Sequence, residues 1–430
     1  MKAVIYFFVA SLLLFTTNGH AKAEKLVSLT LVDPHGLTET IRARDRLERY
    51  RAVNFLLAQP YRKVVRVYGK EKEGSLRTYI TSYYPNGQVK RYLQVVNSRA
   101  SGLYQEWHSS GQRKLCAQVV GGEPDVEDSS ITTYLFDGPA EVWDEAGRPL
   151  ALFSYQRGSL EGVVIEYHPT GALKERAHFT GGLRQWLTQR FSEGGELKEE
   201  VTFHEGEPQG EAHGYWPDGR SSYNELYKKG LLHEGLYFDE EGDCIATIHQ
   251  GRGRRARFLR EGRFDLIEYR EGVCEGAVEE LDADFHLLRR YHTKNGVKHG
   301  EEIEFYPPSP FGQEAAARPK LLITWQQGLL HGTVKSWYPS GQLESQREMA
   351  HNKRYGPSTG WYEEGQLMLI EEYEEDRLIK GSYFSHSSGL PVSHVVAGSG
   401  LATLYDGSGH LIRKVVYQGG LPEAGGQEAK

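Results

Sequence analysis

The stretch Trp337-Tyr338-Pro339-Ser340-Gly341-Gln342-Leu343 places an aromatic residue, a tight turn and an aliphatic residue within seven positions. Proline presets φ at the first corner of such a turn, and glycine supplies the left-handed corner. From Gln342 to Met349, polar residues then alternate with less polar ones, which is the period of an extended strand with one polar face. The stretch therefore predicts an antiparallel β-hairpin.

The same unit recurs at a step of about 24 residues along most of the chain. The glycines that close the equivalent turns are Gly87, Gly111, Gly147, Gly171, Gly195, Gly219, Gly341, Gly365 and Gly389. One longer step, from Gly111 to Gly147, holds an insertion near residues 122–134. Self-similarity at a fixed period indicates a stacked repeat array. Because a single hairpin is marginally stable in water, tandem hairpins must bury each other's faces.

An aromatic residue stands four positions before the turn glycine in most units. We call five of these residues, which share one phase of the repeat, the aromatic ladder: Trp107, Trp143, Tyr167, Trp337 and Trp361. Aromatic cross-strand pairs stabilise neighbouring hairpins, and an exposed aromatic strip suits a protein or glycan partner. The ladder is therefore the candidate partner-binding site, while the turn glycines are structural.

The pattern resembles the bacterial MORN-repeat-variant family, some of whose members are described as antitoxin-type proteins. The resemblance rests on the units 337–343, 167–173, 83–89 and 361–367, and spans roughly residues 76–420 with gaps. It implies an elongated, single-layer antiparallel sheet of tandem β-hairpins that acts as a scaffold. The denser glycine pattern of eukaryotic MORN units is partly lost here, so phospholipid binding is carried over to no residue.

The rest of the chain divides around this array. The sequence predicts a signal peptide at 1–23, an N-terminal strand and helix cap at 24–75, tandem repeats at 76–420 with insertions near 122–134 and 306–320, and a flexible tail at 421–430. Lys2, a short apolar run and Ala21-Lys22-Ala23 are typical of a cleaved secretory signal. An uncleaved anchor is the alternative, although the run is too short to span a bilayer.

Within the cap, residues 38–59 favour a helix that ends before Pro60. Such a helix would cover the first exposed edge of the sheet, which repeat arrays need for solubility. The loop near 306–320, which contains Pro307-Pro308-Ser309-Pro310, is either a partner contact or a harmless insertion.

Charge and motifs argue against several function classes. A formal net charge of −7 opposes binding to nucleic acid and does not support association with an anionic membrane. Hydrolase, zinc-protease and phosphate-loop motifs are missing from the sequence. Equivalent histidines in successive repeats lie too far apart to share one zinc ion. The sequence therefore predicts no catalytic residues, no metal and no cofactor.

Arginines cluster at one place, between Arg252 and Arg263. They form either a site for an acidic or phosphorylated partner or a solvated face neutralised by Glu261, Glu268 and Glu271, and strand alternation favours the second reading.

We therefore expect an exported, noncatalytic scaffold that binds a protein or glycan partner along an extended sheet face, in the periplasm, at the cell surface or outside the cell. One alternative is an antitoxin-like neutralising protein. Another is a carbohydrate-active enzyme, which two facing carboxylates in a cleft within 253–328 would favour.

Overall fold

The computed structural model describes residues 25–60, 62–70, 74–260, 262–308 and 317–423. These residues form one long open antiparallel sheet of 34 strands, with two short helices among them. The all-β hairpin-repeat fold predicted from the sequence is thereby confirmed. The chain divides into two compact units, residues 1–207 (unit 1) and residues 208–430 (unit 2).

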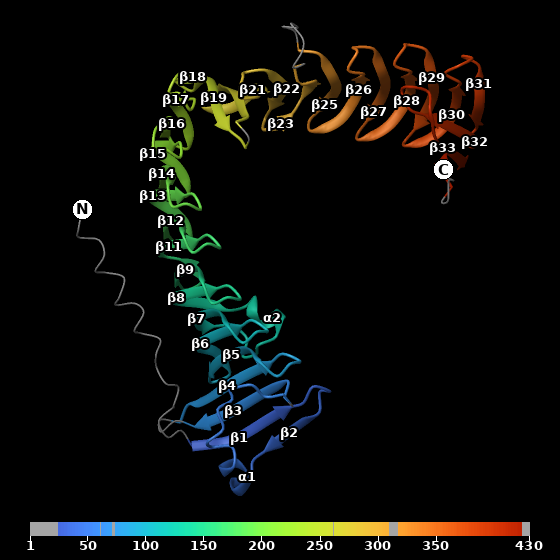
Figure 1. Ribbon diagram of the computed structural model, residues 1–430. Helices are drawn as coiled ribbons and strands as arrows, with labels where there is room; N and C mark the ends of the chain where they lie inside the picture. The colour runs from blue at the N-terminus through green and yellow to red at the C-terminus, as the bar shows by residue number, and fades with distance from the viewer. Residues whose placement is uncertain (1–24, 61, 71–73, 261, 309–316, 424–430) are drawn as a thin grey trace. The chain divides into compact units, whose positions relative to one another are not determined.

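The elements of unit 1 follow each other in chain order (Figure 1). They are β1 (Lys25–Val32), β2 (Thr38–Ile41), α1 (Arg44–Glu48), β3 (Val64–Lys70), β4 (Leu76–Tyr83), β5 (Val89–Val96), β6 (Arg99–Trp107), β7 (Arg113–Gly121), α2 (Asp128–Ile131), β8 (Leu135–Trp143), β9 (Pro149–Gln156), β10 (Ser159–Leu160), β11 (Gly162–Tyr167), β12 (Leu173–Thr180), β13 (Leu183–Phe191) and β14 (Leu197–His204).

Unit 2 continues the alternation of strands and turns. Its strands are β15 (Glu207–Tyr215), β16 (Ser221–Lys228), β17 (Leu231–Phe238), β18 (Cys244–His249), β19 (Arg252–Phe258), β20 (Phe264–Arg270), β21 (Val273–Leu281), β22 (Leu287–Lys294), β23 (Val297–Lys298), β24 (Gly300–Phe305), β25 (Pro319–Gln326), β26 (Leu329–Trp337), β27 (Leu343–Ala350), β28 (Lys353–Trp361), β29 (Leu367–Glu374), β30 (Arg377–Phe384), β31 (Pro391–Val396), β32 (Ser399–Tyr405), β33 (Leu411–Gln418) and β34 (Leu421–Pro422).

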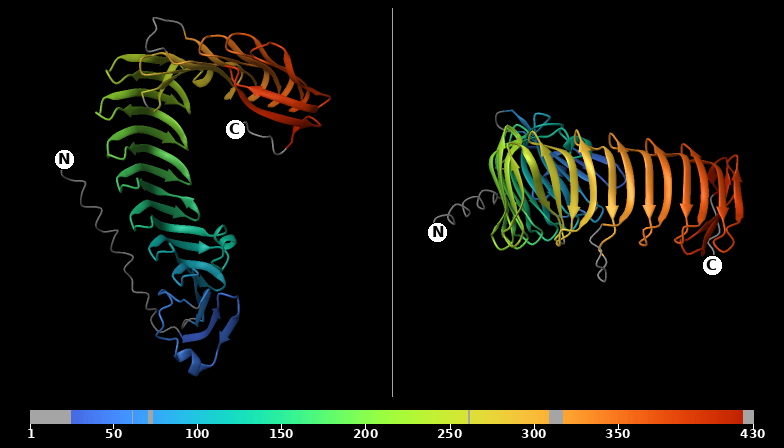
Figure 2. Two further views of the ribbon diagram at one scale, coloured as in Figure 1. Left: turned by 45° about the vertical axis from the view of Figure 1, so that its right-hand side comes forward. Right: turned by 90° about the horizontal axis from the view of Figure 1, so that it is seen from above.

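Each hairpin pairs with the next through antiparallel ladders, as β26–β27 and β27–β28 do. In both units the hairpin ends therefore form rows along the sheet edges, which Figure 2 shows for β21 to β33. The nine turn glycines named above have φ between +67° and +93°. Only glycine enters this backbone region without a steric cost, which explains why it recurs at this place in the repeat.

The N-terminal region differs from the sequence prediction. Instead of a helix over 38–59, the structure places strand β2 (Thr38–Ile41) against β1 and confines helix α1 to Arg44–Glu48. Ile41 and Leu47 are buried in one cluster with two leucines of β1. The β-branched residues of 38–41 complete the sheet there, so the first edge is a short strand rather than a helix.

The insertion near 122–134 is folded onto unit 1. It contains helix α2, and its Val126 and Tyr134 join the buried cluster around Leu93 and Tyr104. Of the loop predicted at 306–320, residues 309–316 lie outside the described residues, as do the proposed signal peptide and residues 424–430. Residues 421–422 form β34 and pair with β33.

Unit 2 contains two corners at which three successive hairpin ends meet. At the first, the Leu232 N–H donates to the Gly272 carbonyl and the Gly272 N–H donates to the Gly251 carbonyl. The second corner repeats these contacts with Leu378, Gly420 and Gly398. A Cβ on Gly272 would lie 2.8 Å from the Leu231 side chain, so the close approach requires glycine.

Candidate binding surfaces

The aromatic ladder occupies equivalent strand ends. All five rings are half-buried, and each residue directly follows a β-bulge: Trp107, Trp143, Tyr167, Trp337 and Trp361. Trp107 packs against the N-terminal core cluster. The Arg113 guanidinium lies 5.6 Å from the centre of the Trp143 ring. These rings therefore contribute to packing between hairpins. Because each residue stands at the end of a strand, its exposed part lies at the edge of the sheet.

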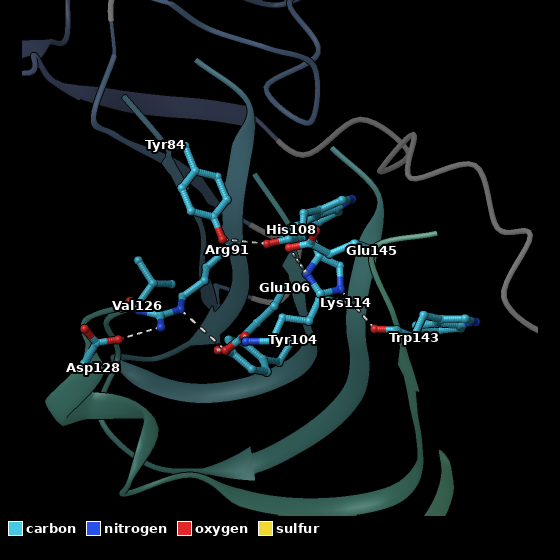
Figure 3. Close-up of polar contacts among 11 residues, drawn as sticks. Tyr84, Arg91, Tyr104, Glu106, His108, Lys114, Val126, Asp128, Trp143 and Glu145 are labelled. Atoms are coloured by element: carbon cyan, nitrogen blue, oxygen red, sulfur yellow. Dashed lines mark hydrogen bonds and ion pairs between the residues drawn. The ribbon is translucent and has the colours of Figure 1, made fainter. Parts of the chain in front are cut away.

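In many repeats, the residue after the aromatic at the end of the strand makes a contact that the sequence analysis missed. The Tyr84 hydroxyl donates to the Trp107 carbonyl at 2.9 Å, and His108 Nε2 lies 3.0 Å from the Trp143 carbonyl (Figure 3). Tyr338 makes the same bond to the Trp361 carbonyl at 2.8 Å. Further pairs of this kind are His168–Phe191, Trp216–Phe238, Tyr306–Trp337 and Tyr362–Phe384. Each bond ties one turn to the following repeat, and an aromatic residue or histidine next to the ladder aromatic was the signal for it.

In other repeats the same position carries aspartate, whose carboxylate accepts hydrogen bonds from backbone N–H groups of the same turn. Asp144 Oδ1 accepts hydrogen bonds from the backbone N–H groups of Ala146 and Arg148, at 2.9 and 2.8 Å. The hydrogen bond from the Arg148 backbone is the main reason that the pKa of Asp144 lies below its usual range. These aspartates are therefore turn caps rather than catalytic acids.

A partly buried polar network anchors the 122–134 insertion to unit 1 (Figure 3). Arg91 pairs with Asp128 at 2.5 Å, donates to the Val126 carbonyl at 3.0 Å, and lies 3.4 Å from Glu106. Burial opposes ionisation of Glu106, but hydrogen bonds from Tyr104 and Lys114 outweigh it and lower the pKa of this carboxyl. The network pairs two cations, Arg91 and Lys114, with two carboxylates, Asp128 and Glu106, so it has the character of a structural anchor.

Unit 2 holds two further carboxylates bound by tyrosines. Glu225, 4% exposed, accepts hydrogen bonds from Tyr227 and Tyr237 and pairs with Arg255 through both carboxylate oxygens, at 2.7 and 3.1 Å. Glu371 accepts bonds from Tyr373 at 3.2 Å and Tyr383 at 2.8 Å.

The arginines between Arg252 and Arg263 are largely neutralised. Of the carboxylates that the sequence suggested, Glu261 lies outside the described residues, and the carboxylates that form the ion pairs are others. The ion pairs are Arg254–Glu279, Arg255–Glu225, Arg257–Asp265 and Arg263–Glu280. A hollow of about 550 Å³ beside them is lined by Glu268, Glu271 and Arg270, among others. Glu268 accepts from the Ala277 N–H at 2.9 Å and pairs with Arg270 at 2.8 Å. The hydrogen bond from Ala277 and the pairing with Arg270 lower the pKa of Glu268, which is unfavourable for a general acid.

Trp186 occupies a position that is glycine in neighbouring repeats. Nine residues before the turn glycine, Gly138, Gly162 and Gly210 have φ of +89°, +87° and +86°, whereas Trp186 has φ of +58°. Its side chain is 58% exposed and packs edge-on against His178, with ring centres 4.4 Å apart. A bulky residue in the left-handed region is a strained exception.

Phe285 is a second such substitution, in unit 2. Its N–H donates to the Asp282 carbonyl as the Gly242 N–H donates to Asp239, so Phe285 stands in the place of a turn glycine. It has φ of +63° and is 49% exposed. Beside it lies a hollow of about 240 Å³ lined by aromatic and acidic side chains.

The same turn brings together the three groups that could hold a metal ion. Ligand atoms of Asp282, Asp284 and His286 lie within 4.8 Å of one another. Asp282 Oδ1 already accepts from the backbone N–H groups of Asp284 and His286, at 3.0 and 2.8 Å. The sequence reasoning did not single out this cluster, whose carboxylate serves the turn. Among the described residues, no helix has the length and apolar character to cross a membrane.

Comparison with known proteins identifies the repeat. Residues 80–97, 160–180 and 330–351 match the family model described as MORN repeat variant. No curated protein matches the chain. A structure of the Photorhabdus luminescens Tc holotoxin pore is similar at 12% identity and a TM-score of 0.12, over 90% of this chain and 24% of that one. The chain thus spans about a quarter of the length of that neighbour. It is a tandem β-hairpin repeat protein that carries MORN repeat variants at three places.

Proposed function

We propose that the chain is a noncatalytic repeat scaffold that binds a protein partner through one face of unit 1, around Trp186. The observation that carries this proposal is the exposed, left-handed tryptophan at a repeat position that holds glycine in the neighbouring repeats. A strained residue of this kind costs roughly 1–3 kcal/mol. Since Trp186 is 58% exposed, burial within the chain does not offset that cost, and a binding role accounts for it.

The neighbours of Trp186 extend the surface. Val163 of β11 pairs with His178 of β12, and His178 pairs with Gln185, next to Trp186 in the bulge of β13. Val163 and Leu187 are 40% and 46% exposed. The opposite face of these strands is buried. Its residues next to the patch are Val164, Ala177 and Thr188. We call Val163, Trp186 and Leu187 the Trp186 patch.

The chemistry of the patch favours a protein over a glycan. The ring contacts His178, but the other exposed members of the patch, Val163 and Leu187, are aliphatic. Sugar recognition needs several polar groups beside the aromatic ring to bind hydroxyls, whereas aliphatic neighbours suit an apolar protein surface. Exposed tryptophan surrounded by apolar residues is typical of the centre of a protein interface.

The noncatalytic part of the proposal is supported by the carboxylates already described. Glu268 is held by Arg270 and a backbone N–H, and Glu225 is held by Arg255. Turn aspartates such as Asp144 accept backbone hydrogen bonds. The pKa of Glu268 and that of Asp144 are lowered by these bonds, whereas a glycosidase acid requires a raised pKa.

The test places a photo-crosslinking residue at position 187 in the full chain, expressed in its own cells. We expect a discrete cross-linked protein that disappears when Trp186→Gly is added. Glycine fits the left-handed backbone, so this variant retains the fold and its thermal midpoint does not fall. The matched control carries the cross-linker at Leu231 in unit 2, which is also 46% exposed. The same products from both positions, or products that persist in Trp186→Gly, would overturn the proposal.

We also propose that residues 1–23 direct export of the chain. Support comes from Lys2, the apolar run that follows and Ala21-Lys22-Ala23. We expect an N-terminus at Glu24 in the exported fraction, determined by terminal sequencing of the natural protein. A chain that retains Met1 and stays inside the cell contradicts export without affecting the Trp186 patch.

A further inference from the structure

The hollow beside Phe285 lies along four successive turns of unit 2, three of which contribute aromatic rings. Trp216 and Phe258 meet edge to face with ring centres 4.6 Å apart, and Phe258 lies 6.3 Å from Phe264. Phe264 in turn meets Phe285 edge to face at 5.1 Å. Phe264 is 4% exposed and Phe285 is 49% exposed, so the wall runs from the protein interior to solvent.

Acidic side chains line the same hollow. Asp239, Glu240 and Glu241 belong to the turn that follows Trp216 along the edge. Asp239 uses one carboxylate oxygen to accept the Gly242 and Asp243 N–H groups, at 2.9 and 2.8 Å. Glu240 and Glu241 are exposed.

One cation also lines the hollow, but it has a partner of its own. Arg263 pairs with Glu280 at 3.3 Å. The lining therefore carries one guanidinium group against three carboxylates, those of Asp239, Glu240 and Glu241, and its net charge is negative.

Aromatic faces combined with carboxylates attract cations. A ring face binds an ammonium or guanidinium group within about 6 Å, more strongly when water is displaced. The aliphatic stem of lysine or arginine also packs on aromatic surface while its charged head reaches polar groups. At about 240 Å³, the hollow is smaller than the ~300–1,000 Å³ typical of sites for drug-sized molecules. That space suits one long side chain.

We propose that this hollow binds a lysine or arginine side chain of a basic peptide segment on a protein partner, against the rings of Trp216, Phe258 and Phe285 and beside Glu240 and Glu241. The site lies in unit 2 and does not depend on the Trp186 patch. The phenyl ring of Phe285 completes it at the cost of a strained backbone, where a glycine would make the same turn without strain.

The test measures binding of fluorescently labelled tetralysine to the full chain by anisotropy. We expect Phe285→Gly to weaken binding about tenfold, the size of effect of a cation–π contact at a partly desolvated site. Because glycine is the residue that other repeats use there, circular dichroism and the thermal midpoint are expected to be unchanged or improved. Unchanged affinity in Phe285→Gly would overturn the proposal.

A second variant removes the charge and keeps the rings. Glu240→Gln with Glu241→Gln is expected to weaken tetralysine binding to a similar degree. The matched control is Glu363→Gln with Glu364→Gln, which occupies the same two turn positions before Gly365 but is not part of this hollow. Equal losses in both double variants would mean nonspecific attraction to an acidic chain, and would overturn the proposal.

Competitors separate the ligand classes. Tetra-norleucine keeps the aliphatic stem without the charge, and chitotetraose tests sugar stacking on the rings. We expect tetra-arginine to compete with tetralysine and both neutral probes to fail. Competition by either neutral probe at the concentration effective for tetra-arginine would assign the hollow to apolar side chains or to glycans instead. These binding measurements concern unit 2 only. Their outcome does not depend on whether Trp186→Gly abolishes the cross-links from unit 1.

Discussion

Two parts of unit 2 repeat the same arrangement with one side chain changed. Glu225, Tyr227 and Tyr237 have the same spacing along the chain as Glu371, Tyr373 and Tyr383, and in both sets the tyrosine hydroxyls bind the carboxylate. Each set lies beside one of the two glycine corners. At both places a Cβ on the glycine two residues before the second tyrosine would strike that tyrosine's hydroxyl, at 2.5 and 2.8 Å.

The sets differ in the charge that faces the carboxylate. Arg255 stands two residues after Gly253, which pairs with Tyr269. In the second set the equivalent glycine is Gly400, paired with Tyr417, and the residue two positions on is Ala402.

The carboxylates respond to this change. Glu225 is 4% exposed beside its arginine, whereas Glu371 is half-buried. Burial raises the pKa of Glu371 above its usual value, against the hydrogen bonds from Tyr383 and Tyr373 and the charge of Arg354. The backbone corner is the same in both sets, so glycines and tyrosines define the shared arrangement, and the sets differ in whether an arginine pairs with the carboxylate at this position.

The largest effect is expected from Arg255→Ala, which leaves Glu225 buried without its cation. Breaking a buried pair in this way costs about 3–5 kcal/mol. Because cooperativity in repeat arrays is local, the measurement is hydrogen–deuterium exchange in β16 to β20 together with the denaturant midpoint.

The neighbouring Arg254→Ala serves as the control. Arg254 is 54% exposed and pairs with Glu279 at 3.1 Å, so its loss should cost no more than about 1 kcal/mol. Equal effects of the two substitutions would show that the Arg255–Glu225 pair does not distinguish the two sets.

Much of this architecture could be predicted because it repeats. The period, the turn glycines and the ladder phase follow from residues at fixed spacing, as in Trp337 to Leu343. Trp186 and Phe285 also stand at positions that the phase marks for glycine, so the signal for both was present. Neither was predicted, because the repeat pattern marks aromatic residues that recur in phase, whereas these two residues interrupt it.

Contacts between strands could not be predicted in the same way. Arg255 reaches Glu225 across 30 residues, and several of the intervening ladders shift register at a bulge, as between Leu226 and Tyr227. A shift of one residue moves a side chain to the other face of the sheet. The helix expected over 38–59 failed for a related reason, because pairing with β1 overrides local propensity at Thr38–Ile41.

A smaller effect is expected from removing one tyrosine hydroxyl from each set. Tyr383→Phe leaves the Glu371 carboxyl with Tyr373 alone among its tyrosine donors, whereas Tyr237→Phe leaves Glu225 with Tyr227 and Arg255. We expect Tyr383→Phe to cost about 1–2 kcal/mol and Tyr237→Phe less, measured at pH 8 by local hydrogen exchange. Both rings are fully buried, so their packing loss is matched. The reverse order would mean that Arg255 does not share the task of holding Glu225.

The smallest effect is a dependence of stability on pH that Glu371 contributes. Its pKa is raised in the folded chain, so the stability linked to its bound proton is fully present below the unfolded pKa of about 4.3 and is lost as pH rises through the folded value. Glu371→Gln removes this loss. Relative to the natural chain, the variant should therefore gain stability with rising pH, by about 1.4 kcal/mol for each unit by which the pKa is raised.

The paired substitution Glu225→Gln separates this effect from the loss of a carboxylate as such. It removes the partner of Arg255, which stays charged throughout, so the variant should be less stable than the natural chain both below and above the window in which Glu371 titrates. The measurement is the denaturant midpoint of both variants from pH 4 to pH 9. Parallel curves for Glu371→Gln and the natural chain would show that the carboxyl of Glu371 titrates no differently in the folded and unfolded chain, and the replacement of Arg255 by Ala402 would then have no electrostatic consequence.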